Sequence, residues 1–485
     1  MSELAVGIAA VGAYVPRLRV DRAEIAAAHE WANPGLRSLA RGVRSACSWD
    51  EDAITMAVAA SRDALRGRDR SAIGALHLAS TTAPYADRLN AGVVSGALGL
   101  DEQARALDLG GSLRAGTSAV LAGFDTAAAR DTQVLCVAAD RRRSAPGSTQ
   151  ELTYGHAAAA IVVGPGAGLA RLVARASLTV DFVDHFRAAD RPFDYQWEER
   201  WIRDEGYGKL LPRLVEHLLA DAGVDAGRIA HLCVPASVRG ADATLAKSAG
   251  IDASALCDQL KDGCGESGSA HALLQLVAAL HDAAPGDLIL VIGVGQGGDA
   301  LLFEATEAVT ALGPRAWPGD GAPCAYPRYL ALSGLLELDR GMRAEMDKVS
   351  ALTAAYRHRD LLLELSGGRC TACGTHQIPR SDVCVNPECR ATGTQEPHSF
   401  ADSTGTVATW SADRLTYTPD PPAYYGMIDF AEGGRLLMDF TDVGDDGVEV
   451  GTPMHMVFRV KDHDPLRGFA RYFWKAAPTG SPGEG

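Results

Sequence analysis

One stretch in the first quarter of the chain constrains the fold more than any other. Residues 107–119 (LDLGGSLRAGTSA) have the pattern of a short strand, a glycine turn and the start of a helix, and small residues continue that helix to position 129. Side chains this small and apolar predict a helix that is buried on all sides. A sharp strand-to-helix elbow exposes one side chain at a helix N-terminus, where free N–H groups and the helix dipole favour developing negative charge. The stretch therefore predicts an α/β fold with the position of a nucleophile at this turn.

Length and composition bound the class of protein. A chain of 485 residues is too long for one hydrophobic core and predicts two or three domains. The net charge of −15 argues against non-specific nucleic-acid binding, which needs a basic surface. No apolar run is long enough to span a membrane, and the N-terminus carries no export leader. Four of the ten cysteines form one cluster and the others are scattered, which favours a reducing cytoplasm over a disulfide framework.

Two halves of the chain repeat one pattern of predicted elements. Each half reads as strand, helices, strand, small-residue helix, strand, glycine turn and strand. The first half closes at 155–164, and the second closes with the glycine-rich turn and strand of 293–305. A repeat of about 150 residues predicts an internal duplication.

Several motifs resemble those of the archaeal-type 3-hydroxy-3-methylglutaryl-CoA synthases, which are members of the thiolase superfamily. Arg-Ala-Gly-Thr at 114–117 resembles the Lys-Ala-Gly-Thr that follows the nucleophilic cysteine in that family. The segments 50–56 (DEDAITM) and 293–300 (GVGQGGDA) match two further family motifs. We expect the three acids at 50–52 to act as simple helix caps. The resemblance covers residues 5–341 and implies a five-layered thiolase fold, a homodimer, and an acyl-CoA or acyl-carrier substrate.

The same motifs show that the catalytic residues of the family have been replaced. Leu113 stands in the register of the nucleophilic cysteine, and Thr81 stands where the family has its acid/base glutamate. Residues 233–235 read Cys-Val-Pro where the family has His-x-Pro. A leucine cannot form an acyl-enzyme, and a threonine cannot take up a proton near neutral pH. The resemblance therefore implies the fold of the family without its usual chemistry.

Other polar residues remain as candidates for catalysis. Ser112 is one position from the cysteine register and is either a relocated nucleophile or the N-cap of the following helix. In the loop 262–270, where the family has an oxyanion-hole asparagine, Cys264 or Ser267 lies near that position. The candidate catalytic residues are Ser112, Thr81, Tyr85, Cys233 and Cys264.

Arginines that follow the strand at 133–140 are candidates for binding the 3′-phosphate of CoA. Arginine suits bidentate contacts with phosphate, although a basic run in a loop also forms an ordinary solvated surface. The candidate phosphate ligands are Arg141, Arg142, Arg143 and Arg239.

Four cysteines beyond the resembling region predict a metal site. Cys370 pairs with Cys373 and Cys384 pairs with Cys389, at the spacing of a zinc ribbon. A closed site of four thiolates has no open position, so we expect a structural zinc. Short alternating segments between 405 and 460 predict a small β-barrel. Ribbon and barrel together resemble the rubredoxin-like zinc-ribbon/OB-fold domain that accompanies thiolase-like enzymes.

The expected fold class is therefore α/β, a duplicated five-layered thiolase fold followed by a zinc ribbon and an OB-type barrel. The acidic character of the barrel region predicts no nucleic-acid partner, and fusion of the two parts suggests that no separate subunit is needed. The predicted divisions are a thiolase-like N-terminal half at 1–165, a C-terminal half at 166–345, a linker helix and zinc ribbon at 346–398, an OB-fold barrel at 399–477 and a flexible tail at 478–485.

Three functions are compatible with this sequence. The first is an enzyme that forms or cleaves a C–C bond of a CoA thioester without an acyl-enzyme, as an aldolase or retro-aldolase does, which the missing cysteine suits. The second is an acyltransferase or condensing enzyme with a relocated serine or cysteine nucleophile. The third is a non-catalytic scaffold that binds acyl-CoA. The polar residues that remain around the predicted site favour an enzyme, while the acyl group and the direction of reaction stay open.

Overall fold

The computed structural model describes residues 6–315, 317, 321–339 and 351–479. The chain divides into two compact units. The first comprises Met1–Ala46, Asp52–Ser95 and Leu100–Tyr326, and the second comprises Cys47–Glu51, Gly96–Gly99 and Pro327–Gly485. Part of the predicted linker helix (340–350) and most of the predicted tail (480–485) lie outside the described residues.

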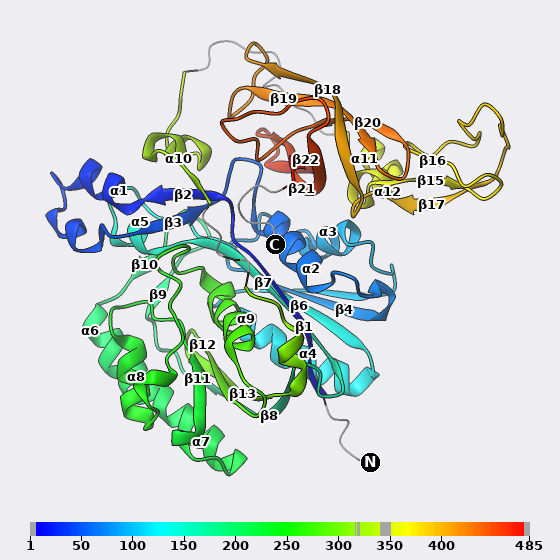
Figure 1. The fold of residues 1–485 in the computed structure, drawn as a ribbon. Coiled ribbons are helices and arrows are strands. Elements are labelled where there is room, and N and C mark those ends of the chain that lie inside the picture. Colours follow the sequence, from blue (N-terminus) through cyan, green and yellow to red (C-terminus); the bar gives the residue numbers. More distant parts are fainter. Residues whose placement is uncertain (1–5, 316, 318–320, 340–350, 480–485) are drawn as a thin grey trace. The chain divides into compact units, whose positions relative to one another are not determined.

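The N-terminal half of the first unit is built on five strands. Their order across the sheet is β5-β4-β6-β7-β1 (Figure 1). β4 lies between β5 and β6 and is parallel to both, whereas β7 is antiparallel to β6 and β1. Strand β7 is buried at nearly every position, as expected for a central strand covered on both faces. The bounds are β1 Val6–Tyr14, β4 Ile73–Ala79, β5 Arg105–Leu109, β6 Gln133–Arg141 and β7 His156–Pro165.

The C-terminal half of the first unit repeats this strand order with one strand reduced, and its strand β8 pairs with β1, so that the two halves form one nine-stranded sheet. The order is β11-β12-β13-β8, with β11 parallel to β12 and the other pairs antiparallel. The counterpart of edge strand β5 is only a single parallel bridge between Leu232 and Leu256. The predicted duplication is confirmed. The bounds are β8 Ala170–Thr179, β11 Ile229–Cys233, β12 Leu288–Val294 and β13 Gly297–Ala305.

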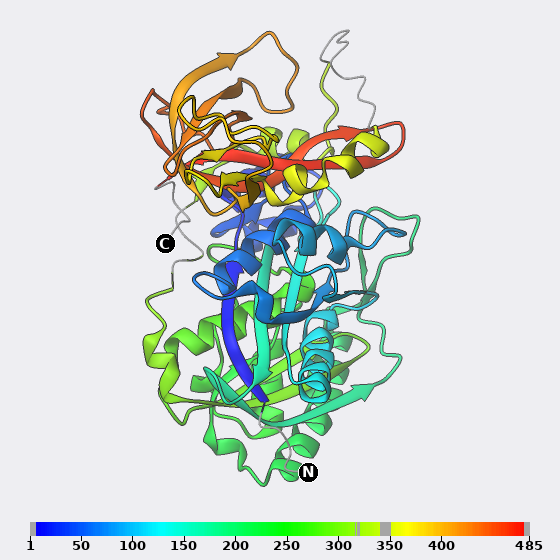
Figure 2. The same ribbon diagram turned by 90° about the vertical axis from the view of Figure 1, so that its right-hand side faces the viewer.

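Helices alternate with these sheets in the first unit (Figures 1 and 2). Helix α2 (Ala53–Ala64) packs on the N-terminal sheet, and α4 (Ala115–Arg130) contacts both that sheet and α9 (His271–Asp282). Helix α9 also packs on β11 and β12, while α7 (Leu211–Ala222) packs on β8 and β13. This alternation gives the predicted five-layered thiolase fold.

The close packing of α4 against the second half of the unit explains the small residues of the elbow stretch. Gly116 of α4 lies so close to the second half that an added Cβ would stand 2.2 Å from the carbonyl oxygen of Ser269. The expectation that this helix is buried on all sides is wrong, because α4 exposes Asp125 and its last turn. The helix that is buried throughout is α9, whose residues His271–Leu280 are all buried.

The acids at 50–52 do not share one role, so the expectation of simple capping is wrong for part of the motif. Asp52 is the N-cap of α2 and forms a capping box with Thr55. Asp50 is instead fully buried within the second unit, where Lys475 Nζ donates to its carboxylate at 2.8 Å. Burial alone would raise the pKa of Asp50, but the attraction of Lys475 and Arg459 outweighs it and lowers that pKa.

The described rest of the second unit consists of short helices, among them α11 (Leu352–Arg357) and α12 (Arg359–Glu364), a small ribbon and a five-stranded sheet. The ribbon strands have the order β16-β15-β17, and the larger sheet has the order β20-β19-β18-β21-β22. A bridge between Phe440 and Ala476 nearly closes that sheet into the predicted OB-type barrel around the buried side chains of Phe458 and Trp474. The bounds are β15 Ser366–Cys370, β16 His376–Gln377, β17 Gln395–Ser399, β18 Thr404–Asp413, β19 Ala423–Phe430, β20 Arg435–Asp439, β21 Pro453–Asp464 and β22 Phe469–Pro478.

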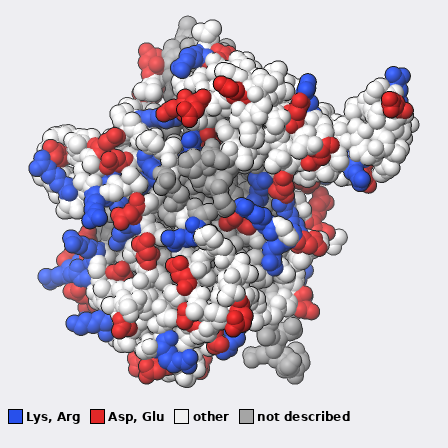
Figure 3. All heavy atoms as spheres, in the orientation of Figure 1, with Lys and Arg blue, Asp and Glu red and all other residues white. Residues whose placement is uncertain are grey.

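Acidic and basic side chains are interspersed on the face shown in Figure 3. Across the part of the chain that is described, no helix is both long enough and apolar enough to cross a membrane.

Candidate active site

The elbow has the predicted strand–turn–helix form. Strand β5 ends at Leu109, Gly111 takes a positive φ of 83°, and α4 begins at Ala115 with Arg114 at its N-cap position. Ser112 therefore precedes the N-cap, and its hydroxyl is 3.5 Å from the Arg114 amide. The Ser112 hydroxyl donates to the Gly295 carbonyl oxygen at 3.2 Å. Among the described residues, no carboxylate or imidazole accepts a hydrogen bond from it, so no base activates Ser112 here.

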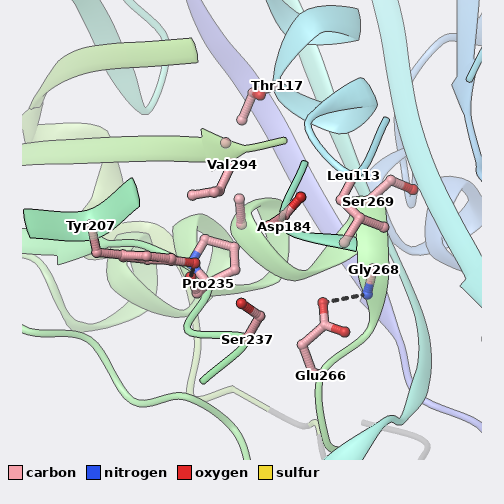
Figure 4. Close-up of a pocket in the computed structure, with 12 residues that line it drawn as sticks. Leu113, Thr117, Asp184, Tyr207, Pro235, Ser237, Glu266, Gly268, Ser269 and Val294 are labelled. Atoms are coloured by element: carbon pink, nitrogen blue, oxygen red, sulfur yellow. Dashed lines mark hydrogen bonds between the residues drawn. The ribbon is translucent and has the colours of Figure 1, made fainter. Parts of the chain in front are cut away.

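A small hollow opens beside Leu113, and several polar side chains line it (Figure 4). Six segments that are distant in sequence meet there: the elbow, the stretch before β9 (His185–Phe186), the π-helix η3 (Ile202–Leu210), the turn after β11, the loop before α9 and the end of β12. The lining residues are Leu113, Thr117, Asp184, Tyr207, Pro235, Ser237, Glu266, Gly268, Ser269, Ala272, Gly293 and Val294.

Glu266 is the carboxylate held most firmly at this hollow. One carboxylate oxygen accepts from the Gly268 amide at 2.8 Å (Figure 4). The other is ion-paired with the guanidinium of Arg142. Arg142 is 3% exposed, pairs with Asp194 as well, and stacks 3.5 Å above the ring of Tyr154. Burial alone would lower the pKa of Arg142, but the two carboxylates outweigh it and raise that pKa, so the arginine stays charged.

This arrangement corrects the expectation for Arg142. A buried guanidinium that is already engaged by two carboxylates and an aromatic ring cannot also serve as an accessible phosphate ligand. Its place indicates that Arg142 positions the carboxylate of Glu266. Of the remaining arginines, Arg143 and Arg239 are exposed and Arg141 is half-buried, and none of them lines the hollow.

Asp184 and Tyr207 bring a second acidic and a phenolic group to the hollow. The Asp184 carboxylate contacts His185 Nδ1 at 3.0 Å and accepts a longer hydrogen bond of 3.4 Å from Gln296. The Tyr207 hydroxyl donates to the Pro235 carbonyl oxygen at 2.5 Å. Burial raises the pKa of Tyr207, and the nearby Asp184 charge raises it further, so the hydroxyl remains a donor.

The Thr81 hydroxyl is hydrogen-bonded to a buried carboxylate and does not line the hollow. Asp140 accepts seven hydrogen bonds from backbone amides and hydroxyls, including Thr81 Oγ1 at 3.0 Å and Ser269 Oγ at 2.8 Å. This cluster fixes Ser269 in the wall of the hollow. Neither Thr81 nor Tyr85 lines the hollow; the Tyr85 backbone is instead held by Asn90.

Cys233 and Cys264 also lie away from the hollow. This placement corrects their selection as catalytic thiols that face the site. Cys264 is fully buried near Ser45, and burial raises the pKa of its thiol. Cys233 is fully buried with its sulfur 3.4 Å from that of Cys257, and burial raises its pKa well above the ordinary value. The hydrogen bond from Cys233, with a contribution from His231, lowers the pKa of the half-buried Cys257 to about 6.

Glu266, Asp184 and Tyr207 are the site residues that the sequence prediction missed. Glu266 lies in the loop 262–270, which the family motif marks, but the search there was for an asparagine substitute. Asp184 begins a stretch of charged and aromatic residues at 184–187 (DHFR). The composition of both loops is visible in the sequence, whereas their convergence is not.

The four clustered cysteines in the second unit fit a tetrahedral metal ion. Their sulfur atoms all lie within 4.8 Å of one another. The Cys370–Cys389 and Cys373–Cys384 sulfur distances are 3.9 and 3.6 Å. Zinc–sulfur bonds of about 2.3 Å in a tetrahedron place sulfur atoms about 3.8 Å apart. The donor set and the spacing thus suit a closed, structural zinc site.

Comparison with known proteins agrees with this geometry. A hydroxymethylglutaryl-CoA synthase of Aeropyrum pernix is 30% identical over 356 residues, spanning 71% of this chain and 94% of the relative. A protein of the same name from Methanopyrus kandleri is 31% identical over 315 residues, spanning 63% of this chain and 89% of the relative. The solved structure of MvaS in complex with 3-hydroxy-3-methylglutaryl coenzyme A has a TM-score of 0.57 at 20% identity, covering 70% and 94% of the two chains.

The C-terminal region matches two family models. Residues 362–395 match the ChsH2 rubredoxin-like zinc ribbon domain, and residues 400–459 match the ChsH2 C-terminal OB-fold domain. The first unit is thus a thiolase-superfamily fold that retains the elbow but carries leucine at the nucleophile position. The chain belongs to the hydroxymethylglutaryl-CoA synthase family, and its fusion to a ribbon and an OB-fold is confirmed.

Proposed function

We propose that this protein forms or cleaves a C–C bond of a CoA thioester without an acyl-enzyme, as an aldolase or retro-aldolase does. The observation that carries the proposal is the hollow beside Leu113, where a thiol is replaced by hydrocarbon and a buried, ion-paired glutamate faces the same space. The relatives are hydroxymethylglutaryl-CoA synthases, and one related solved structure holds a 3-hydroxyacyl-CoA. A 3-hydroxyacyl thioester is the natural substrate of a retro-aldol cleavage.

In the cleavage direction, Glu266 would act as the base. It takes the proton of the 3-hydroxyl group, the C2–C3 bond breaks, and C3 leaves as an aldehyde or ketone. The electron pair passes into the thioester enolate, which then takes a proton at C2 to give the shorter acyl-CoA. In the synthetic direction the same steps run in reverse.

The remaining predictions are proposed alongside this function. Zinc in the four-cysteine site would stabilise the ribbon and take no part in the reaction. Arg141, Arg143 and Arg239 stay as proposed ligands of the CoA phosphate, and a homodimer stays as the proposed assembly.

The experiment that tests the function combines product trapping with acid quenching. Purified protein is incubated with a panel of 3-hydroxyacyl-CoAs, including the 3-hydroxy-3-methylglutaryl thioester. Released aldehyde or ketone is trapped with a hydrazine, and the quenched protein is examined by mass spectrometry. We expect carbonyl product and shortened acyl-CoA without a covalent adduct. An adduct on Ser112 would establish a relocated nucleophile instead, and binding without turnover across the panel would favour the scaffold.

The role of Glu266 is tested with Glu266→Gln. Loss of a general base lowers the turnover number by about 10²–10⁴-fold. The matched control is Glu304→Gln, at a partly exposed glutamate of β13 that pairs with Arg171. If the two variants lose activity equally, Glu266 is not the base.

A further inference from the structure

Two cysteines of the first unit lie in direct contact with each other. The sulfur atoms of Cys233, at the end of β11, and of Cys257 are 3.4 Å apart. Cys233 is fully buried, whereas Cys257 is partly exposed to solvent. The sulfur atoms of a disulfide are about 2.05 Å apart, so a small rotation of the two side chains would bring this pair to bonding distance.

Hydrogen bonds hold the two segments that carry these thiols side by side. The Cys257 amide donates to the Leu232 carbonyl oxygen at 3.1 Å. Two residues further along, the Gln259 side chain donates to the Val234 carbonyl oxygen and accepts from the Ala236 amide, both at 3.0 Å. Because these bonds flank the two sulfur atoms, the folded protein already places one thiol against the other.

The surroundings of Cys257 favour its thiolate form. The hydrogen bond from Cys233 and the proximity of His231 lower the pKa of Cys257 to about 6, although burial and the charge of Asp282 oppose this shift. His231 Nε2 lies 3.4 Å from the Asp287 carboxylate. The hydrogen bond with Cys257 outweighs burial and raises the pKa of His231, and Asp287 raises it further. Burial raises the pKa of Cys233 well above its ordinary value, so Cys257 is the nucleophilic thiol of the pair.

We propose that Cys233 and Cys257 form a reversible disulfide when the protein meets a small hydroperoxide. Redox-sensitive sites combine an accessible thiolate with a second, resolving cysteine, and this pair has that arrangement. The inference does not depend on the proposed function, because neither thiol lines the hollow.

The oxidation takes place in two steps. The Cys257 thiolate attacks one peroxide oxygen, the O–O bond breaks, and the departing hydroxide takes up a proton to become water. The sulfur of Cys233 then attacks the sulfenic acid formed on Cys257. The S–O bond breaks, and its hydroxide leaves as water with the proton of Cys233. Two thiols thus give two electrons to one peroxide, and a dithiol reductant reverses the change.

The position of the pair connects it to the wall of the candidate active site. Pro235 follows Cys233 by two residues, lines the hollow and accepts the hydrogen bond from Tyr207. A disulfide would add a covalent link between this stretch and the segment around Cys257, to which only hydrogen bonds now join it. Oxidation would therefore act beside the hollow without consuming any group that lines it.

The test maps disulfides in the full-length protein by mass spectrometry. The protein is treated with an equimolar amount of hydrogen peroxide, its remaining thiols are alkylated, and it is digested with trypsin without reductant. Cleavage after Arg239 and Lys247 separates the two cysteines, so their disulfide joins peptide 229–239 to peptide 248–261. We expect this linked pair to appear, and to be lost again when the oxidised protein is treated with dithiothreitol. Absence of the linked pair, or its persistence after dithiothreitol, would overturn the inference.

Two variants separate the roles of the thiols. In Cys233→Ser the sulfenic acid on Cys257 has no resolving partner and should be trapped by dimedone, whereas in Cys257→Ser we expect Cys233 to stay unlabelled. The matched control is Cys136→Ser, at a fully buried cysteine of β6 that donates to a backbone carbonyl oxygen, and it should form the linked pair as the unsubstituted protein does. Dimedone labelling of Cys233 in Cys257→Ser would contradict the assignment of Cys257 as the attacking thiol. The mapping of the unsubstituted protein does not depend on the folding of any variant.

Discussion

The hollow beside Leu113 and the four-cysteine cluster are both built from a few polar side chains, but they are assembled in opposite ways. All four thiolates come from the short stretch between Cys370 and Cys389, on turns beside the strands of one ribbon. The hollow takes its residues from six segments between Leu113 and Val294, which only the packing of the two halves of the fold brings together. A site whose residues lie within one short motif can be recognised from their spacing in the sequence. A site whose residues are brought together only by the tertiary fold cannot.

The largest effect is expected at the cluster. Structural zinc in small domains binds with about 10–16 kcal/mol, because folding and metal binding are coupled. Cys384→Ser should therefore lose the metal and unfold the ribbon, as measured by zinc content per chain and by protease sensitivity of residues 366–399. Cys257→Ser is the control and should keep its zinc. Full zinc content in Cys384→Ser would show that the site is not a closed set of four thiolates.

The next effect is expected where the hollow depends on a buried ion pair. Arg142→Met leaves Glu266 and Asp194 buried without their cation, which costs about 3–5 kcal/mol. Denaturant unfolding measures this loss. Arg171→Met breaks a half-exposed surface pair with Glu304 and should cost about 1 kcal/mol or less. A similar loss of unfolding free energy in both variants would show that the buried ion pairs at the hollow stabilise the fold no more than an exposed surface pair does.

A smaller effect is expected at Asp140, which ties together the two halves at the hollow. Asp140→Asn replaces an acceptor of seven hydrogen bonds by a group that also donates, so at least one amide or hydroxyl loses its partner. We expect a loss of about 2 kcal/mol in the free energy of unfolding. Asp125→Asn, at an exposed aspartate of α4, is the control and should change stability by about 0.5 kcal/mol or less. Equal values would contradict the role assigned to Asp140.

The smallest effect concerns the thiols of the first unit. The pKa of Cys257 is lowered to about 6, so its reactive thiolate is present above that pH, whereas the Cys233 pKa is raised and its thiol stays protonated. Alkylation of Cys257 by iodoacetamide should rise as pH increases through 6 and become nearly constant above 7, with Cys233 unlabelled. Peptide mass spectrometry measures both positions. Faster labelling of Cys233 would restore it as a candidate nucleophile.

Much of the architecture followed from local patterns. The elbow, the duplicated halves, the ribbon and the barrel each have a periodicity or a spacing that lies within a few tens of residues. Replacement of the nucleophilic cysteine by Leu113 was likewise visible in one motif. Capping by Asp52 was predicted for the same reason, since an N-cap bonds an amide only three positions away.

The partners of the polar residues were decided by the tertiary structure. Asp50 reaches Lys475, Thr81 reaches Asp140, and Arg142 reaches Glu266, in each case across a long stretch of sequence. From the sequence, Cys233 and Arg142 are plausible site residues, but in the structure both are buried and have internal partners. Glu266 and Tyr207 are candidate site residues only because the fold brings them beside Leu113. The sequence alone determined which elements form, and it predicts which catalytic group is missing. The fold determined which groups line the hollow, because burial and ion pairing depend on segments that only the packing of the two halves brings together.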